Sequence, residues 1–103
     1  MKVTMTGFAR QQLRETANYI AKEFGEKPRE SFMQKVLETK QLLETNPYSG
    51  AIEPLLSDLP TTYRSVVVTR LSKMVYRIID DRIEIAAFWD CRREPRSLAN
   101  QVG

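Results

Sequence analysis

The spacing of apolar residues changes near the middle of the chain, and this change constrains the fold more than any other feature. Between residues 9 and 43, apolar residues recur every three or four positions, as on one face of an α-helix. Between residues 63 and 89 they are β-branched and aromatic and come in short runs, which is typical of strands. The chain is therefore predicted to be an α+β protein, with its helices ahead of most of its sheet.

The helices are predicted to form an antiparallel hairpin near the N-terminus. A strand at residues 2–5 and a helix at residues 7–24 come first. Gly25 suits the turn that follows a helix. Pro28 suits the first turn of a second helix, which ends before Asn46 because a proline comes next. The first helix carries one apolar stripe, made of Ala9, Leu13, Ala17, Ile20, Ala21 and Phe24.

The second half of the chain predicts an antiparallel meander. Its strands are expected at residues 63–69, 73–80 and 82–89, with short turns between them. Residues 47–62 are rich in proline and turn residues, and a connection of that length is often a binding loop. The predicted order is β-α-α-β-β-β, in which the helical hairpin packs on a small, mainly antiparallel sheet. A single domain is expected over residues 1–103.

Alternation along the last strands divides their side chains between a core face and an outer face. The core face, under the helices, is expected to hold Met74, Tyr76, Ile78, Ile83, Ile85, Ala87 and Trp89. The outer face is expected to hold Lys73, Val75, Arg77, Ile79, Arg82, Glu84, Ala86 and Phe88, with Arg64 beside them. Arg77 and Glu84 are either a cross-strand ion pair or part of a binding surface.

The composition excludes several kinds of site. The chain has no histidine and one cysteine, so a Ser–His–Asp triad, a histidine metal site and an internal disulfide are all excluded. We expect no metal and no cofactor. With no histidine to activate it, Cys91 is not expected to be a nucleophile. The chain lacks a run of about 20 apolar residues and an apolar signal segment, so no membrane association and a cytoplasmic location are expected.

Basic residues gather in the second half of the chain, although the net charge is only +3. No acid occurs between Thr61 and Ile79, and further arginines follow the last predicted strand. Such clusters attract phosphate, but the same residues could equally be solvated strand faces paired to nearby acids. Asp90 could pair with an arginine beside it, and Cys91 could be a small inert filler. The candidate binding residues are Arg70, Arg77, Arg92 and Arg93.

Four segments together resemble a known family. They are ETNPYSG (44–50), YRSVVV (63–68), VYRIIDDRIEI (75–85) and WDCRREP (89–95). In this order and spacing the chain is similar to the RelE/ParE superfamily of toxins from bacterial type II toxin–antitoxin systems, over nearly its whole length. The resemblance implies a small toxin of a plasmid-stabilisation kind, encoded beside an antitoxin that wraps and neutralises it.

The RelE branch of this superfamily implies a ribosome-dependent mRNA endoribonuclease that needs no metal. The residues that match its catalytic positions are Arg64, Lys73 and Arg93. Val66 replaces a second basic residue, and no tyrosine or histidine follows Pro95. Arginine can stabilise a crowded phosphate but cannot give up its proton, so another group must accept the 2′-OH proton. The candidate bases are Lys73, Glu84, Asp90 and Glu94, and the strands also supply Tyr63 and Tyr76.

The ParE branch implies inhibition of DNA gyrase without a catalytic site. The long helical hairpin, the strand YRSVVV and the RRxP ending resemble this branch more closely. Two further alternatives are a non-toxic relative that only binds an antitoxin, and a generic RNA-binding domain. The last would need a stacking aromatic on the exposed sheet face, for which Phe88 is the candidate.

The expected partners are a cognate antitoxin and either DNA gyrase or the ribosome with its mRNA. The antitoxin segment is expected to be acidic or amphipathic, so that it can cover the basic face or lie along the helical hairpin. A homodimer is also compatible with the sequence.

Overall fold

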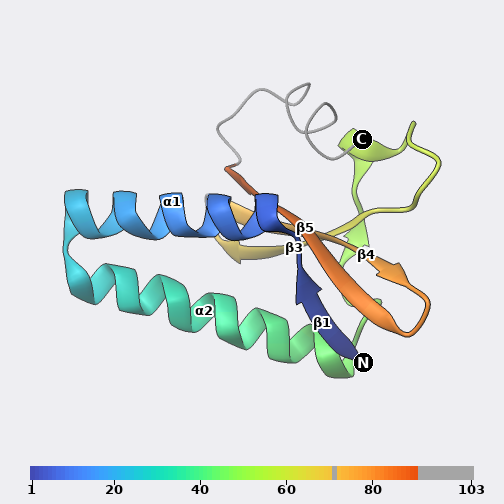
Figure 1. The fold of residues 1–103 in the computed structure, drawn as a ribbon, viewed down its shortest axis with the longest axis horizontal. Coiled ribbons are helices and arrows are strands. Elements are labelled where there is room, and N and C mark those ends of the chain that lie inside the picture. The colour runs from blue at the N-terminus through green and yellow to red at the C-terminus, as the bar shows by residue number, and fades with distance from the viewer. Residues whose placement is uncertain (71, 91–103) are drawn as a thin grey trace.

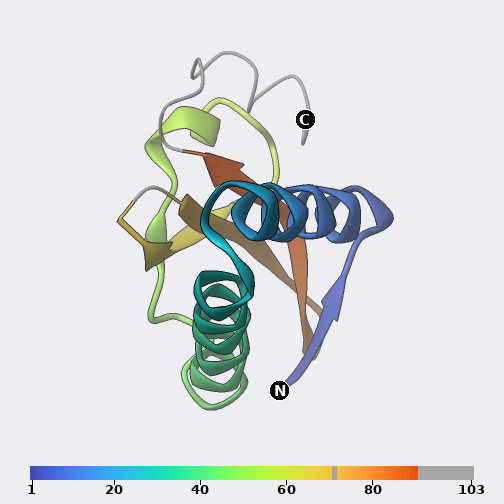
Figure 2. The same cartoon turned by 90° about the vertical axis from the view of Figure 1, so that its left-hand side faces the viewer.

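The computed structural model describes residues 1–70 and 72–90. They form an α+β domain in which two helices lie over one face of a sheet (Figures 1 and 2). The predicted fold class, with a helical hairpin ahead of an antiparallel meander, is confirmed. The elements are β1 (Lys2–Met5), α1 (Gly7–Phe24), α2 (Glu26–Thr45), β2 (Ala51–Ile52), the 3₁₀ helix η1 (Pro54–Leu56), β3 (Arg64–Thr69), β4 (Ser72–Ile79) and β5 (Arg82–Asp90).

The ends of the two helices are fixed by local hydrogen bonds. Thr6 caps α1, because its Oγ1 accepts a hydrogen bond from the Ala9 N–H at 3.1 Å. Gly25 separates α1 from α2 with φ of 104°, a conformation that glycine adopts without strain. Its N–H donates to carbonyl oxygens in the last turn of α1. The hairpin is therefore closed by one residue, and α2 begins two positions before Pro28.

The first and the last strands of the described chain are neighbours in the sheet. Its strand order is β1-β5-β4-β3-β2. β1 runs parallel to β5, with Lys2 opposite Arg82, and the other neighbours are antiparallel. β2 was not predicted, since two residues cannot show a periodic pattern; pairing with β3 defines it. The connection over residues 47–62 thus contains a strand and η1.

A β-bulge in β5 reverses the predicted alternation. Val75 lies opposite Ala87, whereas the next residue of β4, Tyr76, lies opposite Ile85. Ala86 is therefore the extra residue, and every side chain after it changes face. The expectation that Ala87 and Trp89 share the face of Ile85 is wrong for this reason.

Two hydrophobic clusters lie on opposite faces of the sheet. The cluster under the helices includes Phe32, Leu43, Met74, Tyr76 and Phe88. Phe88 was predicted on the exposed face as a stacking aromatic, and that prediction is wrong because its side chain is 5% exposed in this core. The second cluster lies where the 47–62 connection covers the outer face, and it contains Leu56, Tyr63, Val75, Ala86, Ala87 and Trp89.

Candidate functional site

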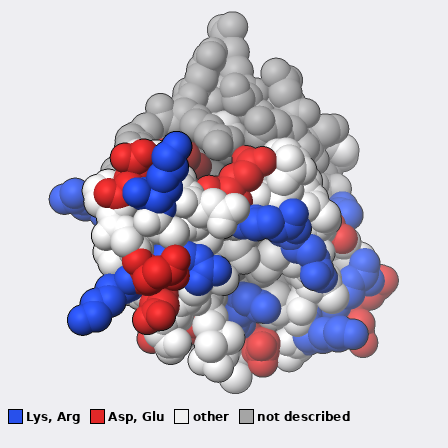
Figure 3. Space-filling view, turned by 60° about the vertical axis from the view of Figure 1, so that its left-hand side comes forward, with Lys and Arg blue, Asp and Glu red and all other residues white. Residues whose placement is uncertain are grey.

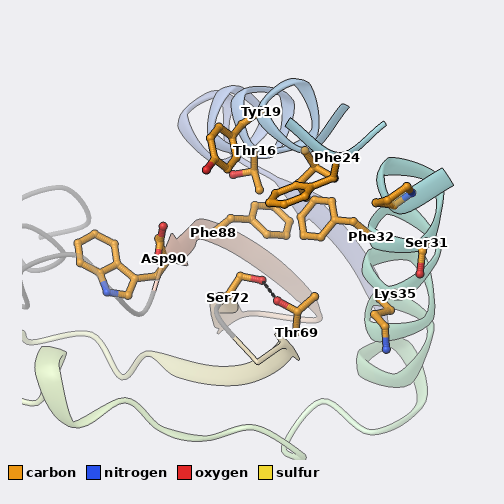
Figure 4. Close-up of a pocket in the computed structure, with 13 residues that line it drawn as sticks. Thr16, Tyr19, Phe24, Ser31, Phe32, Lys35, Thr69, Ser72, Phe88 and Asp90 are labelled. Atoms are coloured by element: carbon orange, nitrogen blue, oxygen red, sulfur yellow. Dashed lines mark hydrogen bonds between the residues drawn. The ribbon is translucent and has the colours of Figure 1, made fainter. Parts of the chain in front are cut away.

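A groove of about 390 Å³ lies where the closed end of the helical hairpin meets the ends of β3, β4 and β5. Phe24, Phe32 and Phe88 converge on it from α1, α2 and β5 (Figure 4). Phe32 and Phe88 are buried and form its floor. Thr69 and Ser72 line its strand side, with their hydroxyl oxygens 2.7 Å apart. The groove is thus mainly apolar and has a small polar margin.

Two exposed aromatic side chains form the helical rim of this groove. Tyr19 is 50% exposed and Phe24 is 66% exposed. Their rings meet edge to face, with centroids 6.3 Å apart. Phe24, the last residue of the predicted apolar stripe of α1, is exposed because it lies on the last turn, beyond the edge of the core. Exposed aromatics beside an apolar groove are typical of a surface that binds another protein.

A buried ion pair occupies the outer face of the sheet. Lys73 Nζ lies 2.7 Å from Glu53 Oε2, and Glu53 is 1% exposed. The Ser65 hydroxyl donates to the same oxygen at 2.6 Å, and the Leu55 N–H donates to Oε1 at 3.2 Å. Burial alone would raise the pKa of Glu53, but the hydrogen bonds from Lys73, Ser65 and Leu55 outweigh it and lower that pKa. The carboxylate is therefore ionised, and it holds the Lys73 ammonium in place.

Arg64 lies on the opposite face from Lys73. It is paired across the strands with Tyr76, on the helix side of the sheet. Its guanidinium donates to the Gly50 carbonyl oxygen at 2.9 Å and lies 5.0 Å from the centre of the Tyr48 ring. The expectation that Arg64 shares the face of Lys73 is wrong. The cause is the pairing register, which places Val67, rather than Arg64, on the Lys73 face.

Tyr76 anchors the turn that follows α2. Its hydroxyl donates to the Pro47 carbonyl oxygen at 2.7 Å and accepts from the Gly50 N–H at 3.0 Å. Burial raises the pKa of Tyr76, although the hydrogen bond at Gly50 and the charge of Arg64 oppose the rise. A neutral phenol held in this way is a structural group. Together with Arg64 it fixes the turn beside β2.

Of the remaining predicted residues, those that the structure describes are not gathered into one site. Arg77 Nε lies 3.0 Å from Glu84 Oε1, so the cross-strand pair, one of the two alternatives for these residues, is observed, and a binding role of Arg77 stays a prediction. Arg70 is exposed at the turn between β3 and β4, and Asp90 lines the groove. Tyr63 is buried in the outer cluster. The predicted roles of Cys91, Arg92, Arg93 and Glu94 fall outside the described residues.

Two features of the site were missed by sequence reasoning. Glu53 lies in a proline-rich connection, and nothing local marks it as the partner of Lys73. The groove is formed by residues from five elements, so no single segment of the sequence indicates it. The sequence feature that could have indicated the groove is Phe24, a large apolar residue at the end of α1 and next to the glycine that closes the hairpin.

Among residues 1–70 and 72–90, no group of three His, Cys, Asp or Glu side chains could hold a metal ion. No helix in the same ranges has the length and apolar character needed to cross a membrane.

Comparison with known proteins assigns a family to this fold. Residues 3–95 match the model for the ParE toxin of the type II toxin–antitoxin system parDE. No curated protein sequence matches the chain.

Three solved structures illustrate the similarity of fold. One is described as the chromosomal ParDE system from P. aeruginosa; it is 20% identical, with a TM-score of 0.71 over 87% of this chain and 95% of that chain. A YoeB/ParE toxin from Agrobacterium tumefaciens is 19% identical, with a TM-score of 0.59 and coverage of 87% and 98%. The YoeB dimer from Staphylococcus aureus is 22% identical, with a TM-score of 0.56 and coverage of 84% and 92%.

Proposed function

The chain belongs to the ParE toxin family of type II toxin–antitoxin systems, and we propose on that premise that it arrests bacterial growth by binding DNA gyrase, without cleaving RNA. The observation that carries this proposal is the buried pair of Lys73 and Glu53. Cleavage of RNA by its own 2′-OH needs a group that accepts the proton and cations free to meet the phosphate.

Lys73 is poorly placed for either task. Turning it toward a phosphate would leave the Glu53 carboxylate buried without its counter-ion, which costs about 3–5 kcal/mol in comparable pairs. Arg64, the other predicted catalytic cation that the structure describes, lies on the opposite face and is held by the Gly50 carbonyl. These contacts favour a toxin that acts through a protein–protein surface.

The target is tested by brief induction of the protein without its antitoxin, followed by primer extension on mRNA and a gyrase supercoiling assay with the purified protein. We expect intact mRNA, growth arrest and loss of gyrase activity. Cuts at codons in the ribosomal A site would overturn the proposal in favour of an endoribonuclease. Normal growth with both readouts unchanged would instead support a relative that only binds its antitoxin.

We also propose that the partner in the cell is an antitoxin, one amphipathic segment of which buries its apolar side chains in the groove. The support is the exposed rim of Tyr19 and Phe24 over a floor of Phe32 and Phe88, since contact surfaces are centred on aromatic side chains in apolar pockets. A solved structure of similar fold is described as a ParDE toxin–antitoxin system.

The groove is tested by titrating the protein with the antitoxin encoded beside it. Phe24→Ala should weaken binding about tenfold or more, because a rim aromatic is removed. Leu37→Ala is the matched control, since Leu37 is 46% exposed on α2 but does not line the groove. Equal affinities for the two variants would contradict this role of the groove.

A further inference from the structure

An open hollow of about 560 Å³ lies where α2 ends and the chain turns toward β2. It is lined by Leu42, Thr45, Asn46, Pro47, Tyr48 and Ser49, none of which lines the aromatic groove. Pro28 of α2 lines the groove and Thr45 lines the hollow, so the two are separated by roughly 25 Å along the same helix. The hollow is therefore a separate surface of the molecule.

Three exposed apolar or aromatic side chains and one arginine adjoin each other at this hollow. Leu42 and Tyr48 line it and are 44% and 66% exposed. The Arg64 guanidinium lies 5.0 Å from the centre of the Tyr48 ring, and Ile52, 56% exposed, is the cross-strand neighbour of Arg64. We call Leu42, Tyr48, Ile52 and Arg64 the turn patch. Large apolar side chains that are exposed side by side mark interaction sites.

The turn patch is held in one geometry by the residues beneath it. The Tyr76 hydroxyl donates to the Pro47 carbonyl oxygen and accepts from the Gly50 N–H, which clamps both ends of the turn that carries the Tyr48 ring. A Cβ at Gly50 would lie 2.7 Å from the Tyr76 hydroxyl oxygen, so this close packing requires glycine. Arg64 is fixed by its hydrogen bond to the Gly50 carbonyl oxygen. A surface that is ordered before binding loses less entropy when it binds.

Arg64 gives the turn patch a positive charge that is not neutralised locally. Within residues 1–70 and 72–90 it forms no ion pair, and its hydrogen bond is to an uncharged carbonyl oxygen. A guanidinium has five N–H donors, so others remain for a partner. The residues that line the hollow are uncharged. Figure 3 looks toward the closed end of the hairpin, and by contrast it shows Lys, Arg, Asp and Glu side chains spread over much of that face.

We propose that the turn patch is the surface through which this toxin contacts the protein that it inhibits. The partner surface offers a carboxylate to Arg64 and an apolar pocket to Tyr48, since these are the groups that complement a guanidinium and an aromatic ring. Tyrosine and arginine are also among the residues that contribute most to protein–protein binding. The inference rests on the proposed function, in which growth arrest follows from binding to a protein.

A nucleic acid fits the turn patch less well than a protein does. Binding to a phosphate backbone depends on several lysine or arginine side chains. Arg64 is the one charged residue among the described residues of the patch and the hollow. A base could stack on Tyr48, but Leu42 and Ile52 would then gain no apolar partner. The apolar residues around a single cation therefore favour a protein surface.

The patch is tested with the whole protein in two assays, inhibition of purified gyrase and growth arrest under titrated induction. Tyr48→Ala should raise the concentration for half-inhibition about thirtyfold and relieve growth arrest, because the central aromatic is removed. Its affinity for the antitoxin should be unchanged, since Tyr48 does not line the groove. Leu37→Ala is the matched control, because Leu37 is 46% exposed on α2 outside the hollow. Circular dichroism checks that each variant is folded.

Arg64→Gln tests the charge separately. It should raise the concentration for half-inhibition about tenfold. Inhibition by the unaltered protein should weaken as salt is raised, and in Arg64→Gln this dependence on salt should be smaller, because an exposed charge pair is missing. A purely structural role of Arg64 would lower the Tm without changing the dependence on salt.

Failure of this inference differs from failure of the proposed function. If gyrase is inhibited equally by Tyr48→Ala and Leu37→Ala, the inference is wrong and the proposed function stands. If gyrase stays active while growth stops, the proposed target is wrong, and full arrest by Tyr48→Ala would then overturn the inference as well. An equal loss of antitoxin affinity in Tyr48→Ala would assign the patch to the antitoxin. Tight binding of a short single-stranded RNA that Tyr48→Ala abolishes would assign it to nucleic acid; either result overturns the inference.

Discussion

Replacing Lys73 by methionine should destabilise the protein by about 2–3 kcal/mol. Removing one partner of a buried ion pair typically costs about 3–5 kcal/mol, because the other charge stays buried. The cost here should fall at or below the bottom of that range, since the Lys73 side chain is 17% exposed and Glu53 keeps its hydrogen bonds from Ser65 and Leu55. The free energy of unfolding in urea measures the effect.

Two further variants isolate the cause. Arg77→Met breaks the other ion pair on β4, whose side chains are 31% and 21% exposed, and should cost only about 0–1 kcal/mol. Adding Glu53→Gln to Lys73→Met should recover about 1 kcal/mol or more. The amide oxygen can still accept from the Leu55 N–H, the amide NH2 can donate to the Ser65 hydroxyl oxygen, and no charge is left buried.

The same pair makes stability depend on pH in a defined direction. The pKa of Glu53 is lowered from 4.5 in the folded protein. Its contribution is therefore fully present above about pH 4.5 and is lost as pH falls through the folded value. In Lys73→Met the counter-ion is gone, so the pKa of Glu53 should be lowered less and this pH-dependent contribution should be smaller. If Lys73→Met costs no more than Arg77→Met and leaves the pH profile unchanged, the reasoning about this buried pair is wrong.

Two other substitutions test contacts that hold the site in shape. Tyr76→Phe removes the hydroxyl that joins Pro47 to Gly50, and should cost about 1–3 kcal/mol with a lower Tm; an unchanged Tm would show that the turn does not need this contact. Gln12→Leu removes the side-chain oxygen that accepts from the Phe88 N–H at 2.9 Å. It should cost about 1–2 kcal/mol and speed hydrogen exchange at that amide, although it also removes a buried amide nitrogen that has no hydrogen-bond partner among the described residues; unchanged exchange would contradict the role of this bond.

The helical hairpin was predictable because its signals are local. The stripe of α1 recurs at helical spacing, Gly25 provides the conformation that closes the turn, and Pro28 fits only an early position in the next helix. The Arg77–Glu84 pair was predictable for the same reason, since a tight turn fixes its register. In each case, neighbours in sequence decide the structure.

The groove and the buried ion pair were not predictable in this way. The bulge at Ala86 leaves no mark in the pattern, because alanine is compatible with both faces of a strand. Glu53 is recognised only after the 47–62 connection has folded back over the sheet and brought it to Lys73. A single extra residue was enough to change which side chains share a face, and one long-range contact was enough to decide how Lys73 is paired.

The parallel pairing of β1 with β5 has a consequence for the order of events during synthesis. The hairpin is built from local contacts and can form early, whereas β1 must wait for residues 82–85 before it gains a partner. Phe88, which forms the floor of the groove, is translated later still. A nascent chain therefore displays its helices before it displays the groove. A partner that needs the groove must therefore wait until the last strand has been translated.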